Sequence, residues 1–196
     1  MEKVFISITG PIRDTYTKFK QEYRKYYLET EIDGEEEESD NFEYGINEPI
    51  DSTDLLKHFN FHDDKELKYF MYIELVMEIF GHSSPPYNGV FNDLAELYKE
   101  KEWEITLVSD ELGKGKPSTL FYLSKNSCYL DNIKFYKKGQ IEELWESCDI
   151  WITSDPEILE KKPKNKKSVK VVTTYNENSD SDFKIENLWE VKTLEM

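Results

Sequence analysis

Residues 149–173, DIWITSDPEILEKKPKNKKSVKVVT, hold two apolar, β-branched segments on either side of a short helical one. The segments 149–153 (DIWIT) and 169–173 (VKVVT) are typical of buried strands, and Pro156–Glu160 is predicted to be a helix. Strands that are nearly continuous apolar runs and alternate with helices indicate a parallel sheet that is covered on both faces. This stretch therefore predicts an α/β fold.

The alternation extends through the rest of the chain. Five strands are expected, at residues 3–8, 105–109, 133–136, 149–153 and 168–173. The other helices are expected at Thr15–Leu28, Asp51–Phe59, Asp64–Phe80, Tyr87–Lys101, Lys116–Lys125 and Gly139–Ser147. One early strand, a long helical interlude and four later strands predict a doubly wound, mostly parallel five-stranded sheet with an inserted helical cap.

This order of elements divides the chain into three parts. Residues 1–29 and 102–175 are predicted to form the α/β core, and residues 30–101 an acidic loop and a helical cap. Residues 176–196 are expected to be a tail that packs on the core through its apolar side chains, Phe183, Ile185, Leu188 and Trp189.

The composition argues against nucleic-acid and membrane binding. The chain has 25 Lys and Arg against 41 Asp and Glu, a net charge of −16, which repels polyanions and anionic lipid surfaces. The two cysteines, Cys128 and Cys148, form neither a disulfide framework nor a metal-ligand pattern. The start of the chain, MEKVFISITG, does not read as a signal peptide, and the apolar window 69–80 is too short to cross a bilayer.

Charge is also segregated along the chain. Residues 29–43 form an acidic run, which is either a solvated loop or a docking site for a basic partner. A basic run follows much later, with Lys161, Lys162, Lys164, Lys166, Lys167 and Lys170. It is either a solvated turn or a surface that pairs with acidic groups of neighbouring subunits.

Small polar side chains follow three of the predicted strands. Ligands of doubly wound sheets bind beyond the carboxyl ends of the strands, so these residues are the candidate site. They are Ser7, Thr9 and Gly10 after the first strand, Ser109 and Asp110 after the second, and Thr153, Ser154 and Asp155 after the fourth.

Three segments that contain these residues resemble motifs of the haloacid dehalogenase-like (HAD) superfamily. KVFISITGPIRDTYTKF (3–19) is similar to its first motif, a strand that ends in Asp-x-Asp-Gly. TLVSDELGKGKPSTLFYLSK (106–125) is similar to the second, and DIWITSDPEILEKKPKNKKSVKVV (149–172) to the fourth. The resemblance is closest to small phosphatases of the deoxyribonucleotidase type, including those encoded by tailed bacteriophages, and covers most of the chain apart from the cap.

The resemblance implies that the catalytic acids are replaced. In such phosphatases the first Asp attacks phosphorus and the second is the general acid and base, whereas this chain has Ser7 and Thr9 there. The acids of the fourth motif, which help to hold Mg²⁺, are matched by Thr153 and Ser154. Because Mg²⁺ prefers carboxylate oxygens, no divalent metal and no other cofactor is expected beside these residues.

The alternative to a complete loss of the site is residual phosphate binding. The resemblance gives Gly10, Ser109 and either Lys114 or Lys116 as the phosphate-contacting groups. A second alternative makes Ser7 the nucleophile, which requires an adjacent base. No histidine lies near a predicted strand end, and Asp14, Asp110 and Asp155 are the acids that could approach.

Two functions follow as expectations. The first is a catalytically inactive HAD-like protein, of phage origin, that contacts other proteins as a structural component of a virion, such as a head–tail connector or tail; it would be found in the virion or the host cytoplasm. The alternative is a nucleotidase-like phosphatase, or a phosphate- or nucleotide-binding module, with altered chemistry, for which Mg²⁺ would be the cofactor.

Overall fold

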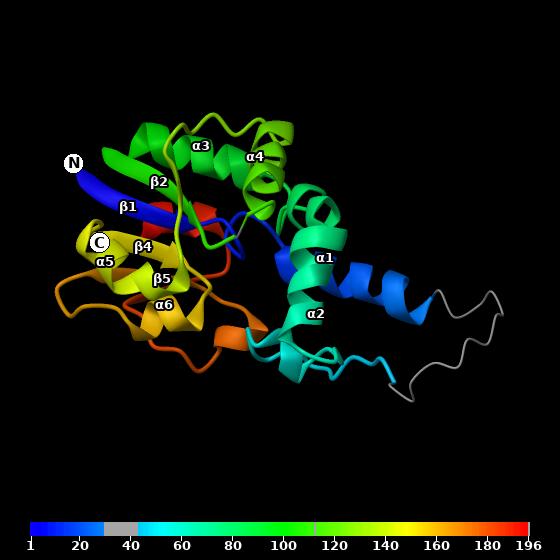
Figure 1. Cartoon of the computed structure of the whole chain (residues 1–196). Coiled ribbons are helices and arrows are strands. Elements are labelled where there is room, and N and C mark those ends of the chain that lie inside the picture. Colours follow the sequence, from blue (N-terminus) through cyan, green and yellow to red (C-terminus); the bar gives the residue numbers. More distant parts are fainter. Residues whose placement is uncertain (30–42, 112, 196) are drawn as a thin grey trace.

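The computed structural model of the chain describes residues 1–29, 43–111 and 113–195 (Figure 1). At its centre is a six-stranded sheet in the order β3-β2-β1-β4-β5-β6, in which all neighbouring strands are parallel. The strands are β1 (Glu2–Ser7), β2 (Trp103–Ser109), β3 (Ile133–Phe135), β4 (Ile150–Thr153), β5 (Lys167–Val171) and β6 (Phe183–Ile185). The expected α/β class with a doubly wound parallel sheet is confirmed.

The helices mostly lie where the sequence predicts them. The α-helices are α1 (Thr15–Tyr23), α2 (Asp64–Tyr69), α3 (Val90–Glu100), α4 (Gly115–Lys125), α5 (Ile141–Glu146) and α6 (Pro156–Glu160). Wider π-helical turns are η1 (Arg24–Leu28), η4 (Phe70–Glu74) and η5 (Met77–Gly81). Short 3₁₀ turns are η3 (Leu55–Lys57), η6 (Lys138–Gln140), η7 (Thr174–Asn176) and η8 (Leu188–Thr193). The helix expected at residues 51–59 is wrong, because the extended backbone of Asp54 leaves only the turn η3.

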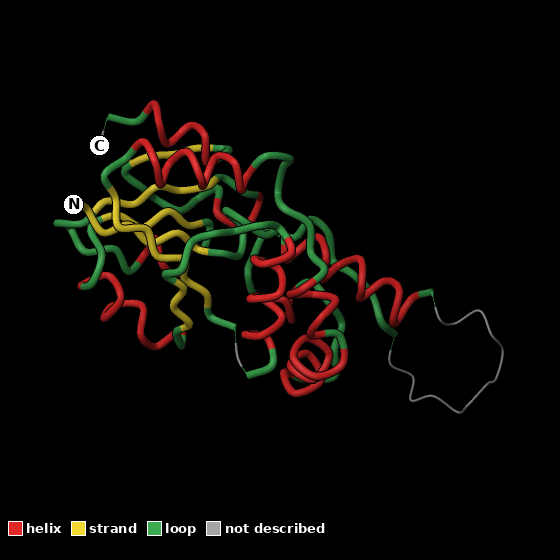
Figure 2. Tube along the Cα trace, turned by 90° about the horizontal axis from the view of Figure 1, so that it is seen from above, coloured by secondary structure: helices red, strands yellow, loops and turns green. Residues whose placement is uncertain are grey.

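Alternation along the strands builds two apolar layers. Val4 and Ile6 of β1 point to one face, where they pack with α3, α4 and η8, and Phe5 points to the other face, where it packs with α5 and α6. Trp145 and Trp151 are fully buried in the second layer, with ring centroids 5.1 Å apart. Figure 2 shows helices on both sides of the sheet.

A third apolar cluster lies beyond the carboxyl ends of the strands. Aromatic side chains dominate this cluster, which we call the cap core: Phe19, Tyr23, Leu55, Phe59, Phe61, Leu67, Phe70, Ile79 and Phe80. In Figure 1 the strands run toward the helices α1 and α2, which carry Phe19, Tyr23 and Leu67 of this cluster, so the cap lies beyond the carboxyl ends of β1 and β2.

Two helices pack in a different part of the protein from the one to which the sequence analysis assigns them. Helix α1 falls in the segment 1–29, which we assigned to the core, yet Phe19 and Tyr23 pack in the cap core. Helix α3 falls in the segment 30–101, which we assigned to the cap, yet Val90, Leu94 and Leu97 pack on the sheet. The acidic run 29–43 lies, apart from its two end residues, outside the described residues. None of the helices described is long and apolar enough to cross a membrane.

The tail contributes a sixth strand, where five were expected. β6 pairs with β5 through Val169 opposite Phe183 and Val171 opposite Ile185. Beyond it, Leu188 and Val191 of η8 are buried against the sheet, whereas the expectation that Trp189 packs on the core is wrong, because its side chain is half exposed. Three residues, FKI, are too few for an alternating pattern to be recognised, so the sequence indicates only that this segment packs on the core.

The tail should therefore be needed for stability. Leu188→Ala removes a side chain that is 1% exposed, and the cavity should lower the free energy of unfolding by about 2–4 kcal/mol. Trp189→Ala is the matched control, because Trp189 is 50% exposed and its loss should change little. Urea denaturation of both variants measures the difference. Equal effects would show that the tail is not packed as described.

Candidate functional site

The polar residues of the predicted site meet at the carboxyl edge of the sheet. β1 is the neighbour of both β2 and β4, so Ser7, Ser109 and Thr153 lie at adjacent strand ends. All three side chains are buried. The juxtaposition arises because adjacent parallel strands end at the same edge.

The Ser7 hydroxyl is held by two neighbours from β4. Its Oγ donates a hydrogen bond to Thr153 Oγ1 at 2.9 Å and accepts one from Trp151 Nε1 at 3.0 Å. Residues 7, 151 and 153 share one face of the sheet because side chains alternate along each strand. Thr153 Oγ1 also accepts a hydrogen bond from the backbone N–H of Asp155 at 3.1 Å. The hydroxyl proton of Ser7 is therefore directed at a hydroxyl and not at a base.

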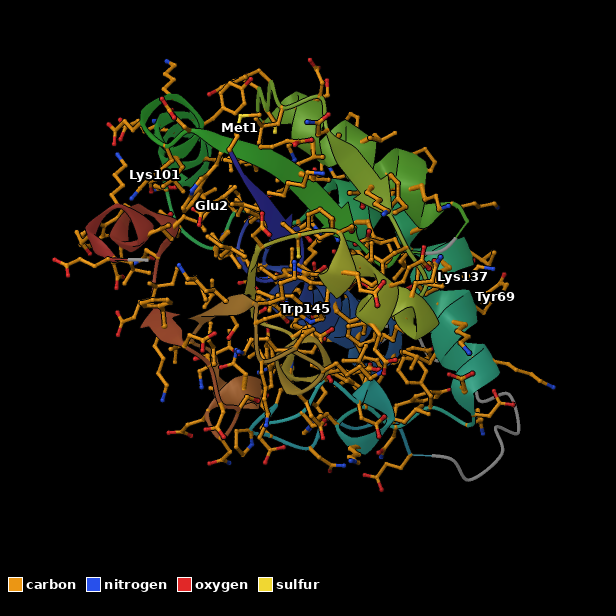
Figure 3. The ribbon with its side chains drawn as sticks, turned by 90° about the vertical axis from the view of Figure 1, so that its left-hand side faces the viewer. Met1, Glu2, Tyr69, Lys101, Lys137 and Trp145 are labelled. Atoms are coloured by element: carbon orange, nitrogen blue, oxygen red, sulfur yellow. The ribbon has the colours of Figure 1, made fainter. Side chains whose placement is uncertain are left out.

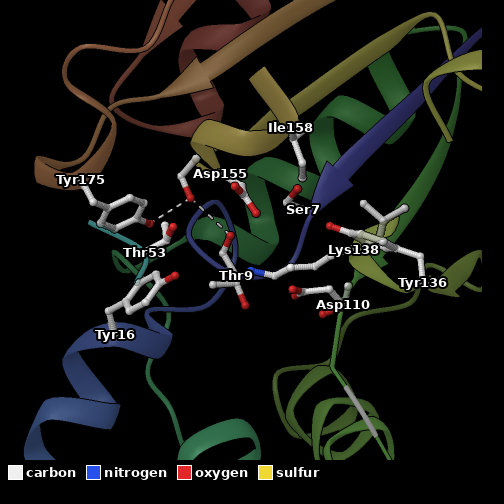
Figure 4. A pocket seen from close by; sticks show the side chains of 13 residues that line it. Ser7, Thr9, Tyr16, Thr53, Asp110, Tyr136, Lys138, Asp155, Ile158 and Tyr175 are labelled. Atoms are coloured by element: carbon white, nitrogen blue, oxygen red, sulfur yellow. Dashed lines mark hydrogen bonds between the residues drawn. The ribbon is translucent and has the colours of Figure 1, made fainter. Parts of the chain in front are cut away.

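The loop after β1 is shaped by close packing. Gly10 has a φ of +90°, and a Cβ built on it would lie 1.8 Å from Ser154 Oγ, so a glycine is needed here. Ser154 Oγ hydrogen-bonds Tyr175 Oη at 3.0 Å and donates to the Thr9 carbonyl oxygen at 3.4 Å (Figure 4). The group that approaches Gly10 closely is therefore the Ser154 side chain of the protein itself.

Ser109 is bound to a buried ion pair that the sequence analysis missed. Its hydroxyl donates to Glu111 Oε2, and Glu111 Oε1 accepts a hydrogen bond from Arg13 Nη2. Arg13 is fully buried and also donates from Nη1 to Thr119 Oγ1 at 2.6 Å and to the Phe80 carbonyl oxygen at 3.2 Å. The hydroxyl expected to contact phosphate is engaged within the protein.

The lysines expected beside Ser109 lie elsewhere. Lys114 and Lys116 are exposed on the surface, and the Lys116 ammonium sits 5.6 Å from the centre of the Phe135 ring. Lys138 lines the pocket in their place. A signal for Lys138 exists in the sequence, since it is the second residue after the predicted strand 133–136, where ligand-contacting residues are expected.

A small chamber lies over these strand ends, and we call it the inner chamber. Its volume is about 50 Å³, enough for a few water molecules or a small polar group. Its lining consists of Ser7, Thr9, Tyr16, Thr53, Val108, Ser109, Asp110, Tyr136, Lys138, Ser154, Asp155, Ile158 and Tyr175. Figure 4 shows the Lys138 ammonium reaching across it toward Thr9, with the carboxylates of Asp110 and Asp155 on opposite sides.

The inner chamber opens into a larger space under the cap, the outer chamber, of about 670 Å³. Five residues line both: Thr9, Tyr16, Thr53, Asp110 and Lys138. The outer chamber adds apolar side chains from the cap, namely Leu55, Leu56, Leu67, Met71, Tyr72 and Phe80. The two chambers form one cleft with a polar inner end and an outer part in which this apolar wall lies beside charged side chains, those of Asp54, Asp64, Lys68, Glu111 and Lys137.

Two carboxyl groups in this cleft have perturbed pKa values. Burial, with the nearby Glu111 charge, raises the pKa of Asp110 to about 6, although the Lys138 ammonium opposes the shift. Burial also raises the pKa of Asp155, whose carboxylate accepts a hydrogen bond from the Glu157 N–H at the start of α6. Perturbed carboxyls gathered in a cleft are typical of functional sites.

The residues at the motif positions do not fit Mg²⁺. Hydroxyls stand where the ion would need carboxylate oxygens, and those of Ser7 and Thr153 are already hydrogen-bonded to each other. Thr9 Oγ1 accepts a hydrogen bond from Arg13 Nη2 at 3.2 Å, which brings a cation to the place of a metal ligand. Over residues 1–29, 43–111 and 113–195 there is no group of three His, Cys, Asp or Glu side chains that could hold a metal.

The basic run proposed as a contact surface is largely engaged within the protein. Lys161 pairs with Glu157 at 2.8 Å, Lys162 with Asp182 at 3.2 Å and Lys166 with Asp149 at 3.4 Å. Lys170 is buried and donates to the carbonyl oxygens of Asn176, Glu177 and Ser179. The six lysines therefore do not form one free basic surface.

Asp110 should make stability depend on pH. Its raised folded-state pKa means that the contribution of Asp110 to the free energy of unfolding is most favourable below about pH 4 and falls as the pH rises toward about 6, because the unfolded state ionises first. Asp110→Asn removes this penalty, so it should stabilise the protein by about 1–2 kcal/mol at neutral pH and hardly at all at about pH 4. Urea denaturation at both pH values tests this. Asp131→Asn, at an exposed position, is the control, and an equal gain in both variants would contradict the assignment.

The Arg13–Glu111 pair should be essential to the fold. Arg13→Met leaves a buried carboxylate without its partner and should cost about 3–5 kcal/mol of unfolding free energy. The double variant Arg13→Met/Glu111→Leu removes both charges and should cost less than the sum of the single changes. Arg24→Met breaks an exposed pair with Glu48 and should have little effect. Additive losses in the double variant would argue against a coupled pair.

Comparison with known proteins identifies the fold. No protein-family model and no curated protein matches the sequence. Among solved structures, a haloacid dehalogenase-like family hydrolase from Streptococcus pneumoniae is similar with a TM-score of 0.58 and 12% identity, over 98% of this chain and 97% of that one. A protein described as a haloacid dehalogenase-like hydrolase from Burkholderia xenovorans gives a TM-score of 0.51 and 12% identity, over 99% and 96%. This chain therefore has the fold of the haloacid dehalogenase-like hydrolases.

Proposed function

We propose that this chain is a HAD-like protein that has lost phosphoryl transfer and acts by binding, chiefly to other proteins. The observation that carries the proposal is the state of Ser7, whose hydroxyl is fully engaged by Thr153 and Trp151. A serine becomes a nucleophile when a neighbouring base accepts its proton. The acceptor of its proton is the Thr153 hydroxyl, which is far too weak a base for this role.

Protein binding is supported by apolar side chains exposed on the cap and on α4. Tyr69, Ile73 and Met77 follow one another at four-residue spacing, and each is more than 40% exposed. Figure 3 shows Tyr69 at the rim of the molecule. Met77 and Phe121 both approach Gly81, so the row continues onto α4. Contiguous exposed apolar surface is characteristic of interaction sites.

The charges favour protein partners over nucleic acid or membrane. The net charge of −16 repels polyanions, and most lysines of the basic run are paired or buried within the chain. The resemblance to phage-encoded phosphatases adds the finer proposal that the partners are virion subunits, and that the protein acts in the virion or the host cytoplasm.

A second candidate is a ligand-binding module, and one observation favours it. The inner chamber holds Asp110, Asp155 and Lys138 around an open volume, with no ion pair within 4 Å between them. Charged groups that face a cavity without such pairing are suited to a ligand that supplies the complementary charges.

A phosphatase assay tests the loss of turnover. With Mg²⁺ and either p-nitrophenyl phosphate or deoxynucleotides, the wild type should give no hydrolysis above the level of buffer, and Ser7→Ala should be identical to it. Loss of a catalytic nucleophile typically lowers the rate by about 10⁴ to 10⁶. Hydrolysis that depends on Mg²⁺ and disappears in Ser7→Ala would overturn the proposal.

The protein-binding part needs its own experiment. A partner cross-linked by the wild type should be lost in the variant Tyr69→Ser/Met77→Ser and kept in Tyr98→Ser, which changes an equally exposed tyrosine on α3. In gel-shift experiments with duplex DNA at near-physiological salt, we expect no shifted band. Sub-micromolar DNA binding, or equal capture by both variants, would contradict the assignment.

A further inference from the structure

We propose that the cleft binds a zwitterion with an apolar side chain, that is, a free α-amino acid of the phenylalanine or leucine kind. The inference rests on the second candidate function and names its ligand. The inner chamber would hold the ammonium and carboxylate groups, and the outer chamber the side chain.

The inner chamber presents charges of both signs. The Asp110 and Asp155 carboxylates lie on opposite sides of the Lys138 ammonium (Figure 4), and all three residues line the same volume. Among the described residues, no side chain donates a hydrogen bond to the Asp110 carboxylate, and the Lys138 ammonium forms no ion pair within 4 Å. An ammonium group on the ligand would satisfy the acids, and a carboxylate would satisfy Lys138.

The balance of these charges argues against a phosphate. With both carboxyls ionised, the chamber carries two negative charges and one positive charge, so a phosphate dianion would meet net repulsion. The hydroxyls of Ser7 and Ser109, which would have to donate to phosphate oxygens, already donate to Thr153 and Glu111. A zwitterion adds no net charge and leaves these internal hydrogen bonds intact.

The outer chamber supplies an apolar wall next to these charges. Asp110 and Lys138 line both chambers, so the charged groups stand at the junction between them. Leu55, Met71 and Tyr72 line the outer chamber only. With its charged end held at the junction, a ligand would extend its side chain over these groups, where burial of apolar surface favours binding.

Four small compounds separate the possible ligand chemistries. Isothermal titration at neutral pH should show binding of L-phenylalanine, with phenethylamine and 3-phenylpropionate each at least about tenfold weaker because each lacks one charge-assisted contact. Inorganic phosphate should not bind. Phosphate binding tighter than phenylalanine, or equal binding of the three organic compounds, would overturn the proposal.

Two variants assign the charges within the chamber. Lys138→Met should weaken phenylalanine by about tenfold or more without changing phenethylamine, and Asp110→Asn should weaken phenylalanine without weakening 3-phenylpropionate. Lys125→Met and Asp131→Asn are matched controls at exposed positions outside the lining, and should bind like the wild type. If the chamber variants also bind like the wild type, the ligand is not held there. The phosphatase assay is independent of this titration, so failure of one proposal does not imply failure of the other.

Discussion

The buried pair of Arg13 and Glu111 is the constraint on which the site depends. A guanidinium without exposure to water must find a hydrogen-bond acceptor for each of its donors, and Arg13 finds them on the loop after β1, on α4 and on the cap. The rings of Phe80 and Tyr122 lie 5.2 and 5.6 Å from it. Because one cation joins these elements, moving the cap away from the strand ends would break the hydrogen bond from Arg13 Nη1 to the Phe80 carbonyl oxygen and leave that buried acceptor without its partner.

Hydrogen bonds within the protein also engage the polar side chains at the strand ends. Glu111 accepts a hydrogen bond from the Ser109 hydroxyl, and Arg13 donates one to the Thr9 hydroxyl. The Ser7 hydroxyl accepts a hydrogen bond from Trp151 and donates one to Thr153. The polar residues at the positions that resemble the haloacid dehalogenase-like motifs thus form internal hydrogen bonds here. Asp110, Asp155 and Lys138 are ionisable groups that line the inner chamber, and the proposed ligand binding rests on them.

The sequence predicts the sheet better than it predicts the site. Strands such as 149–153 are strongly apolar, and their order alone indicates a parallel α/β fold, whereas β6 has only three residues and gains its structure from pairing with β5. The hydroxyls at Ser7, Ser109 and Thr153 were expected at the carboxyl ends of strands, and the strand order of the structure makes these ends adjacent. Their partners could not be expected, since Arg13 and Glu111 lie far apart in the chain and meet only when the loops fold. For the same reason, the sequence does not indicate whether Lys116 or Lys138 reaches the cleft. The answer depends on the orientation of α4 and η6 relative to the sheet.

The state of Asp110 supports the proposal that the cleft binds a ligand. Burial raises the pKa of its carboxyl to about 6, so ionisation at neutral pH opposes folding. A structural position would do better with an asparagine, which has the same shape and no charge to desolvate. Arg13 and Glu111 differ in this respect, because each is compensated within the protein. The Asp110 carboxylate lowers stability, lines a cavity and lies beside Lys138. A bound ligand that supplies the missing partner would explain these features, because its binding would offset the free-energy cost of folding with this carboxylate buried.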